Sequence, residues 1–250
     1  MLRESDYPLP AAIYTAYDEA EALVMELDMD DMDPVATQTL VAELGMLKDD
    51  STLADYLGDE NYTTAQELAA QLQIPLAMLQ QTEPWLAAMT VEVMMMTRVG
   101  FDPQKGIESH LMRMAIDDAK EITGLETERE QLEMLDGLPS DTQIAMLMQI
   151  LQEGGELESM LDELIDAWRH GDTTFMQETM LQDMQDSPEL FNTLVASRNR
   201  NWLQQIEVLL TDEDDYLIVV GALHLVGDIG MPELLRKRGF DVRQIRQNTD

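Results

Sequence analysis

The sequence predicts a helix-rich α/β fold, in which the two ends of the chain form a small, mostly parallel sheet around a long helical insert. Three short segments are typical of strands: the apolar runs at residues 22–29 and 216–222, and the shorter segment 240–245, in which apolar and polar residues alternate. Continuous apolar runs of this length suit strands that are buried on both faces, as in a parallel sheet. We therefore expect a single domain over residues 1–250, with a mostly helical insert over residues 50–210.

The regions between these runs have the apolar spacing of helices. The predicted helices are 11–23, 63–72, 85–99, 106–122, 140–153, 157–170, 173–184 and 187–210. No period of about 20–50 residues recurs along the chain, so a solenoid is not expected.

Charge and composition exclude several classes of protein. The chain has 50 acidic and 15 basic residues, a net charge of −35, which repels nucleic-acid phosphates and anionic lipid surfaces and excludes nucleic acid as a partner. The absence of cysteine excludes disulfides, thiolate catalysis and Cys-ligated metal sites. No apolar run reaches the about 18 residues that a transmembrane segment needs. The N-terminus has no signal-peptide pattern.

His224 is the first candidate for chemistry. It follows the 216–222 run, with Gly221 before it and with Gly227 and Gly230 after it. Glycines let the backbone turn sharply at the carboxyl end of a strand, where ligands bind in open α/β sheets. A histidine with only a structural role in a tight turn is the other interpretation, and the spacing leaves both open.

Two charged residues lie where apolar side chains are expected. Glu26 stands near the end of the 22–29 run, and a carboxylate there is costly unless it is paired, hydrogen-bonded or bound to a cation. Arg198 interrupts the apolar face of a helix, where a guanidinium needs a carboxylate partner or an anionic ligand. A strand that has reached solvent would explain Glu26 without a function, and an internal salt bridge would explain Arg198.

Glu108 and His110 form a third candidate pair. Glu108 falls in the first turn of the predicted helix 106–122, where the helix dipole favours a negative charge, and His110 falls on its apolar face. Side chains two positions apart point in different directions on a regular helix. The two share one site only if Glu108 lies in an irregular first turn. A core histidine and a dipole-stabilising glutamate are the alternative.

Several segments, taken in order, resemble the TraB/PrgY/GumN family, which includes the Tiki-type metal-dependent proteases. The segment from Gly221 to His224 matches the second of the family's two Gly-x-x-His motifs. The other matching segments are Tyr7-Pro8-Leu9-Pro10, Glu26-Leu27-Asp28, Gly106-Ile107-Glu108 with His110, Gly124-Leu125-Glu126-Thr127, and Arg198-Asn199 with Trp202. The resemblance therefore spans almost the whole chain.

The resemblance implies a divalent metal ion, manganese, cobalt or zinc, whose ligands are His224, Glu26, Glu108 and His110. The implied chemistry is metal-assisted hydrolysis of a peptide or protein substrate, with Glu26 or Glu108 as the general base. Arg198 and Asn199 would orient the substrate or the ligands, and the three glycines would shape the turn. The alternatives are a non-catalytic protein that sequesters a signalling peptide, and a purely structural acidic domain.

One departure from the family concerns the N-terminus. The family's first Gly-x-x-His motif lies just upstream of the segment that matches residues 7–10, and Met1 falls where the residue after its histidine is expected. We therefore expect the chain to be truncated relative to the family, through a start codon placed too late or a true loss, with impaired activity. Bacterial relatives commonly carry an export signal in that region, which favours a periplasmic or otherwise exported location.

Overall fold

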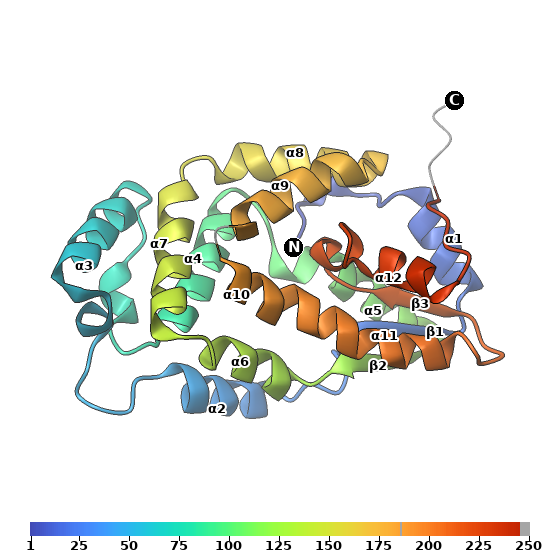
Figure 1. The fold of residues 1–250 in the computed structure, drawn as a ribbon, viewed down its shortest axis with the longest axis horizontal. Coiled ribbons are helices and arrows are strands. Elements are labelled where there is room, and N and C mark those ends of the chain that lie inside the picture. Colours follow the sequence, from blue (N-terminus) through green and yellow to red (C-terminus); the bar gives the residue numbers. More distant parts are fainter. Residues whose placement is uncertain (186, 246–250) are drawn as a thin grey trace. The chain divides into compact units, whose positions relative to one another are not determined.

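One part of the chain forms a three-stranded parallel sheet (Figure 1). The computed structural model describes residues 1–185 and 187–245. The strands are β1 (Ala22–Leu27), β2 (Glu121–Glu126) and β3 (Tyr216–Val219), in the order β2-β1-β3. The central strand β1 pairs in parallel with both neighbours. The predicted class, a helix-rich α/β fold with a small parallel sheet, is confirmed.

The chain divides into two compact units. The first unit holds the sheet and consists of Met1–Asp31, Pro103–Thr127 and Asp162–Asp250, and the second consists of Met32–Asp102 and Glu128–Leu161. The helices of the second unit are α2 (Pro34–Gly45), α3 (Leu53–Gln71), α4 (Pro84–Arg98), α6 (Glu128–Asp136) and α7 (Ser140–Glu153). Of these, α3, α4 and α7 enclose an apolar core, in which Val91 of α4 and Leu147 of α7 are fully buried.

Helices of the first unit cover both faces of the sheet. The helices that begin in this unit are α1 (Ala11–Glu19), α5 (Ile107–Asp118), α9 (Thr173–Gln185), α10 (Pro188–Phe191), α11 (Ser197–Leu209) and α12 (Met231–Arg238), and α8 (Leu157–His170) leads into it. Leu23 and Met25 of β1 pack against α1 and α5, while Val24 packs against α11 and α12. Burial on both faces explains why β1 has a continuous apolar run.

The largest differences from the predicted elements concern residues 106–122 and 240–245. The helix predicted at 106–122 ends at Asp118, and the residues that follow form the edge strand β2. Residues 240–245 were predicted as a strand, and this prediction is wrong. Their exposed polar side chains leave too little apolar surface for a buried strand. Gln244 instead donates a hydrogen bond of 2.7 Å to the carbonyl of Gly171, at the turn between α8 and α9.

Replacing Gly124 of β2 with alanine is expected to destabilise the sheet by roughly 3 kcal/mol, because overpacking against backbone cannot be relieved by a side-chain rotation. A Cβ atom there would lie 2.5 Å from the backbone nitrogen of Asp28 and 3.1 Å from the carbonyl oxygen of Glu126. Urea denaturation measures the loss. The matched control is Gly155→Ala, which meets no atom within 4 Å and is expected to change stability by less than about 0.5 kcal/mol. Equal losses in the two variants would contradict the prediction.

Candidate functional site

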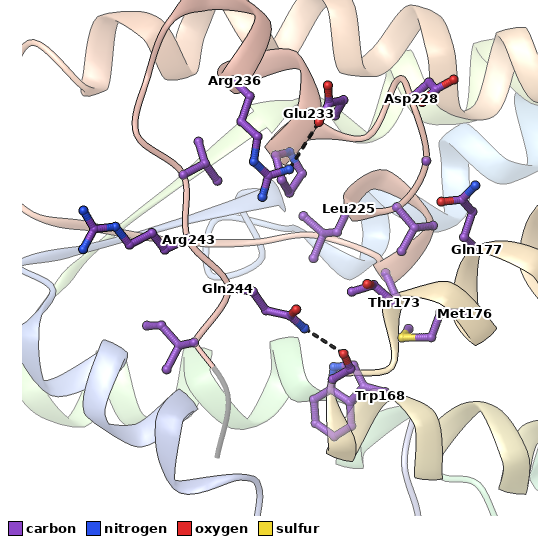
Figure 2. Close-up of a pocket in the computed structure, with 17 residues that line it drawn as sticks. Trp168, Thr173, Met176, Gln177, Leu225, Asp228, Glu233, Arg236, Arg243 and Gln244 are labelled. Atoms are coloured by element: carbon purple, nitrogen blue, oxygen red, sulfur yellow. Dashed lines mark hydrogen bonds and ion pairs between the residues drawn. The ribbon is translucent and has the colours of Figure 1, made fainter. Parts of the chain in front are cut away.

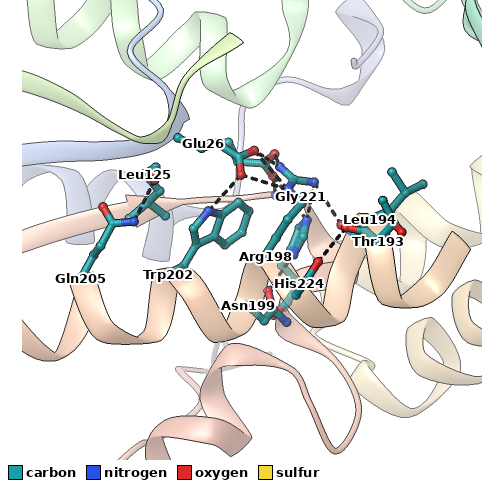
Figure 3. A network of polar contacts seen from close by, with 12 residues as sticks. Glu26, Leu125, Thr193, Leu194, Arg198, Asn199, Trp202, Gln205, Gly221 and His224 are labelled. Atoms are coloured by element: carbon teal, nitrogen blue, oxygen red, sulfur yellow. Dashed lines mark hydrogen bonds and ion pairs between the residues drawn. The ribbon is translucent and has the colours of Figure 1, made fainter. Parts of the chain in front are cut away.

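The polar residues of the candidate site gather at the carboxyl ends of the three strands (Figure 3). Glu26 is near the end of β1, Glu126 is the last residue of β2, and Gly221 follows β3. In open α/β sheets this edge is where ligands bind. Three segments that are far apart in the sequence therefore contribute to one place.

The remaining side chains of the site come from α11. Arg198 and Asn199 both lie on the side of this helix that carries Trp202, since Trp202 is four positions after Arg198 and three after Asn199. The helix is preceded by a π-helical segment, Asn192–Ala196, in which the hydroxyl of Ser197 donates to the carbonyl of Asn192 at 2.8 Å. Segments of this kind are frequent at functional sites. This one widens the helix directly before the residues that contact the strand ends.

Arg198 links the two carboxylates. Its Nη2 atom lies 2.5 Å from Glu26 Oε2 and 2.5 Å from Glu126 Oε1, and its Nε atom lies 3.0 Å from Glu126 Oε1. The side chains of Arg198 and Glu126 are only 11% and 9% exposed, whereas Glu26 is 23% exposed. The internal salt bridge that the sequence left open for Arg198 is therefore present, and it has two acidic partners.

The imidazole of His224 is buried, and its hydrogen bonds define its tautomer. Its Nδ1 lies 2.7 Å from Asn199 Oδ1, while the amide nitrogen of Asn199 donates to the carbonyl of Ile229 at 2.8 Å. This amide orientation places the imidazole proton on Nδ1, so Nε2 carries a lone pair. Nε2 is 3.1 Å from Nη1 of Arg198, and the ring lies 4.4 Å from that of Trp202.

Protonation of His224 is expected to occur far below neutral pH. Burial lowers the pKa of His224 to about 4, with Glu26 opposing and Arg198 assisting this shift. Because the folded pKa lies below the unfolded value of about 6.5, stability is full above pH 6.5 and falls by about 3 kcal/mol as the pH drops from 6.5 toward 4. An NMR titration, with the signal assigned by its loss in His224→Ala, should give a midpoint near pH 4. A midpoint near about 6.5 would contradict this expectation.

The turn that carries His224 also contacts the carboxylate of Glu26. The backbone nitrogen of Gly221 donates to Glu26 Oε1 at 2.6 Å, and the same oxygen lies 4.0 Å from His224 Nε2. A Cβ atom at Gly221 would lie only 3.2 Å from this carboxylate oxygen. Gly227 has a φ of +79°, a conformation that favours glycine. Gly230 completes the turn, donating to the carbonyl of Gly227 at 3.0 Å.

Glu108 and His110 belong to a different group of residues. The ring of His110 contacts those of Tyr7 and Tyr14, at centroid distances of 5.1 and 5.9 Å. Burial lowers the pKa of His110, and Arg113 adds to this shift. The carboxylate of Glu108 lies over Gly106, at the start of α5. The structure thus brings together Glu26, His224, Arg198 and Asn199, and it gives Glu108 and His110 separate surroundings.

The side chains around Arg198 do not, as arranged, form a metal site. Glu26, Glu126 and the lone pair of His224 are suitable ligands, but the guanidinium of Arg198 lies among them. A divalent cation there would lie next to a fixed positive charge. Within residues 1–185 and 187–245, no three His, Asp or Glu side chains are grouped so that they could hold a metal ion. The metal cofactor stays a prediction.

Sequence reasoning did not identify Glu126 and Trp202 as site residues. The indole of Trp202 donates to Glu126 Oε2 at 3.2 Å, and Arg198 Cζ lies 4.6 Å from the centre of its ring. The only available signal for Glu126 was its place in the segment Gly124-Leu125-Glu126-Thr127, which matches the family. Trp202 was visible as an aromatic residue one helical turn after Arg198.

A small parallel sheet covered by helices on both faces, with a buried charged cluster at its carboxyl edge, defines a helix-rich α/β protein with a polar site. The chain belongs to the TraB/PrgY/gumN family, whose model matches residues 1–244. It is also similar to "Uncharacterized protein YbaP" of Escherichia coli (strain K12) and of Shigella flexneri, with 24% identity over 229 residues that cover 92% of this chain and 82% of each relative. No solved structure matches the chain. The family prediction is confirmed.

In the part of the chain that the structure describes, no helix combines the length and the apolar character that crossing a membrane requires. This agrees with the prediction that the sequence contains no transmembrane segment.

Proposed function

We propose that the chain is a hydrolase that cleaves a peptide substrate at the carboxyl edge of its sheet. The observation that supports this proposal most is the arrangement around His224. A neutral imidazole with a lone pair on Nε2 lies 4.0 Å from a carboxylate and 3.1 Å from a guanidinium. Proton acceptors next to a fixed positive charge are what hydrolysis needs, because water must lose a proton while negative charge develops on the scissile carbonyl oxygen.

The geometry suggests a role for each side chain. Glu26 is the most exposed member of the charged cluster, so we assign it as the general base that takes a proton from water. Arg198 fixes the direction of this carboxylate, because its Nη2 atom donates to Glu26 Oε2 at 2.5 Å. Asn199 acts as a positioning residue, because its amide oxygen holds the imidazole of His224 in one tautomer. Glu108, the other predicted base, lies in the separate group with His110 and is not assigned a role.

Peptide cleavage tests this proposal. The protein is incubated with a mixed peptide library, once with a chelator and once with each of manganese, cobalt and zinc, and products are identified by mass spectrometry. Glu26→Gln is expected to abolish cleavage, whereas the matched variant Glu108→Gln is expected to retain it. Cleavage by Glu26→Gln at the wild-type rate, or no cleavage by the wild type in any condition, would contradict the hydrolase proposal.

Peptide binding without cleavage is the second candidate, and a cavity of about 490 Å³ favours it (Figure 2). Ala222 and Leu225, from the turn that carries His224, form part of its wall. The wall also contains Trp168 and two guanidinium groups, those of Arg236 and Arg243. Its volume is within the range of small-ligand sites. Asp228 and Glu233 also line it, and Glu233 pairs with Arg236 at 3.3 Å, so the wall combines apolar side chains with charges of both signs and suits a peptide that has apolar and polar groups.

Fluorescence separates the two candidates. Trp85 and Trp202 are fully buried, so a peptide in this cavity is expected to change mainly the emission of Trp168. Binding that is lost in Leu225→Asp and kept in Glu26→Gln, with no product formed, would support sequestration. An unchanged emission spectrum at saturating peptide would count against it.

A further inference from the structure

We propose that Arg198 is the resident cation of this site, and that its guanidinium takes the position that a divalent metal ion would need. The proposal concerns which cation the site contains. It does not depend on whether the chain cleaves peptides.

The first argument is the direction of the ligands. Two carboxylates, from Glu26 and Glu126, approach the same Nη2 atom at 2.5 Å. The third candidate ligand, the lone pair of His224 Nε2, lies 3.1 Å from Nη1 of the same guanidinium. Carboxylate oxygens and an imidazole nitrogen are also the ligands that manganese, cobalt and zinc take from proteins. In this structure, the guanidinium of Arg198 contacts all three of these groups.

The second argument is charge. Glu126 and Glu26 are largely removed from water, so their charges need compensation. A guanidinium cannot lose its proton under any ordinary condition, and its planar set of donors matches a carboxylate. A divalent cation could neutralise both carboxylates in the absence of Arg198. In its presence, the same ion would meet a permanent like charge within the site.

The third argument is that Arg198 is held in place. Its Cζ atom lies 4.6 Å from the centre of the Trp202 ring, and its Nη1 donates to the carbonyl of Leu194 at 3.1 Å. With the two carboxylates and His224, these contacts surround the guanidinium. A metal ion that displaced it would have to break all of them.

This arrangement makes a prediction about the site without its arginine. Arg198→Met keeps an unbranched stem against Trp202 and removes the charge and the donors. Two carboxylates and one imidazole nitrogen would then face a vacated position. We expect this variant to gain a divalent-cation site that the wild type lacks.

Cobalt binding tests the prediction, measured by equilibrium dialysis at high ionic strength, which screens the acidic surface, and by visible absorption. Arg198→Met is expected to bind one Co²⁺ per chain at least about tenfold more tightly than the wild type does. The double variant Arg198→Met/His224→Ala should lose that gain. Two matched controls should not show it: Arg198→Lys, which keeps the charge, and Arg200→Met, which changes an exposed arginine on the same helix.

Two results would overturn the proposal. One is a folded Arg198→Met with no gain in Co²⁺ affinity. The other is a wild-type Co²⁺ site that disappears in both Glu26→Gln and His224→Ala, because a metal would then be bound beside Arg198. This second comparison decides the question if Arg198→Met fails to fold, and the absence of such a wild-type site then supports the proposal. Peptide cleavage is not a readout here, so a failure of the proposed function stays distinguishable.

Discussion

Replacing Arg198 with methionine is expected to lower the free energy of unfolding by about 3–5 kcal/mol in metal-free buffer, because removing one partner of a buried ion pair leaves uncompensated charge. In this variant Glu26 and Glu126 would keep their negative charges without the guanidinium that lies 2.5 Å from both. Urea denaturation followed by circular dichroism measures the loss. The variant lowers stability even though methionine suits a helix and can still contact Trp202.

Two further variants sharpen this expectation. Arg200→Met, at an exposed position on the same helix, should change stability by less than about 0.5 kcal/mol. Adding Glu126→Gln to Arg198→Met should recover part of the loss, because one of the two uncompensated charges is removed. If Arg198→Met and Arg200→Met lose the same stability, the ion pairs around Arg198 contribute little and the expectation is wrong.

Replacing Trp202 with alanine is the second change with a large expected effect, about 3–5 kcal/mol of stability. The side chain is fully buried, in the same apolar cluster as Val24 of β1 and Met231 of α12. The same ring also contacts Arg198 and His224, so the cavity left behind would open directly beneath the polar site. Urea denaturation measures the loss, and an NMR titration reports whether His224 becomes easier to protonate.

Trp202→Phe separates the stability that the aromatic ring contributes from the stability that the indole N–H contributes. Phenylalanine keeps most of the apolar contact and removes the indole hydrogen bond to Glu126 Oε2, so the expected loss is smaller, about 1–3 kcal/mol. Trp168→Ala, at a less buried tryptophan, should also cost less than Trp202→Ala. A Trp202→Ala variant as stable as Trp168→Ala would show that the ring does not support the site.

The strands differ in how clearly the sequence marks them. β1 is buried on both faces, so its apolar run is continuous and was predicted. β2 is an edge strand whose buried residues are Ile122 and Leu125, separated by Thr123 and Gly124, so no continuous run marks it. The 240–245 segment has apolar residues at a strand-like spacing but no partner in the sheet. Whether a segment with this spacing forms a strand depends on a partner strand, and that partner can be distant in the sequence.

The candidate site was only partly predictable for a related reason. Glu26 and Arg198 attracted attention because each places a charge on an apolar face, and the structure pairs them with each other. His224 and Asn199 followed from the family motifs, and they are hydrogen-bonded to each other. Glu108 and His110 came from the same resemblance, yet their surroundings are set by the N-terminal tyrosines. Local patterns identify unusual residues, whereas the strand register determines which of them meet.

The placement of β1 between two later strands has a consequence for how the chain is made. Glu26 and Gly221 are hydrogen-bonded although 195 positions separate them, and Arg198 reaches Glu26 across 172 positions. Contacts this distant slow folding. During translation, one edge of β1 has no partner until β2 (Glu121–Glu126) is made, and the other edge has none until β3 (Tyr216–Val219) is made, and open strand edges promote aggregation. A stalled or shortened translation product would expose this strand, which makes early termination more hazardous for this chain than the size of its sheet suggests.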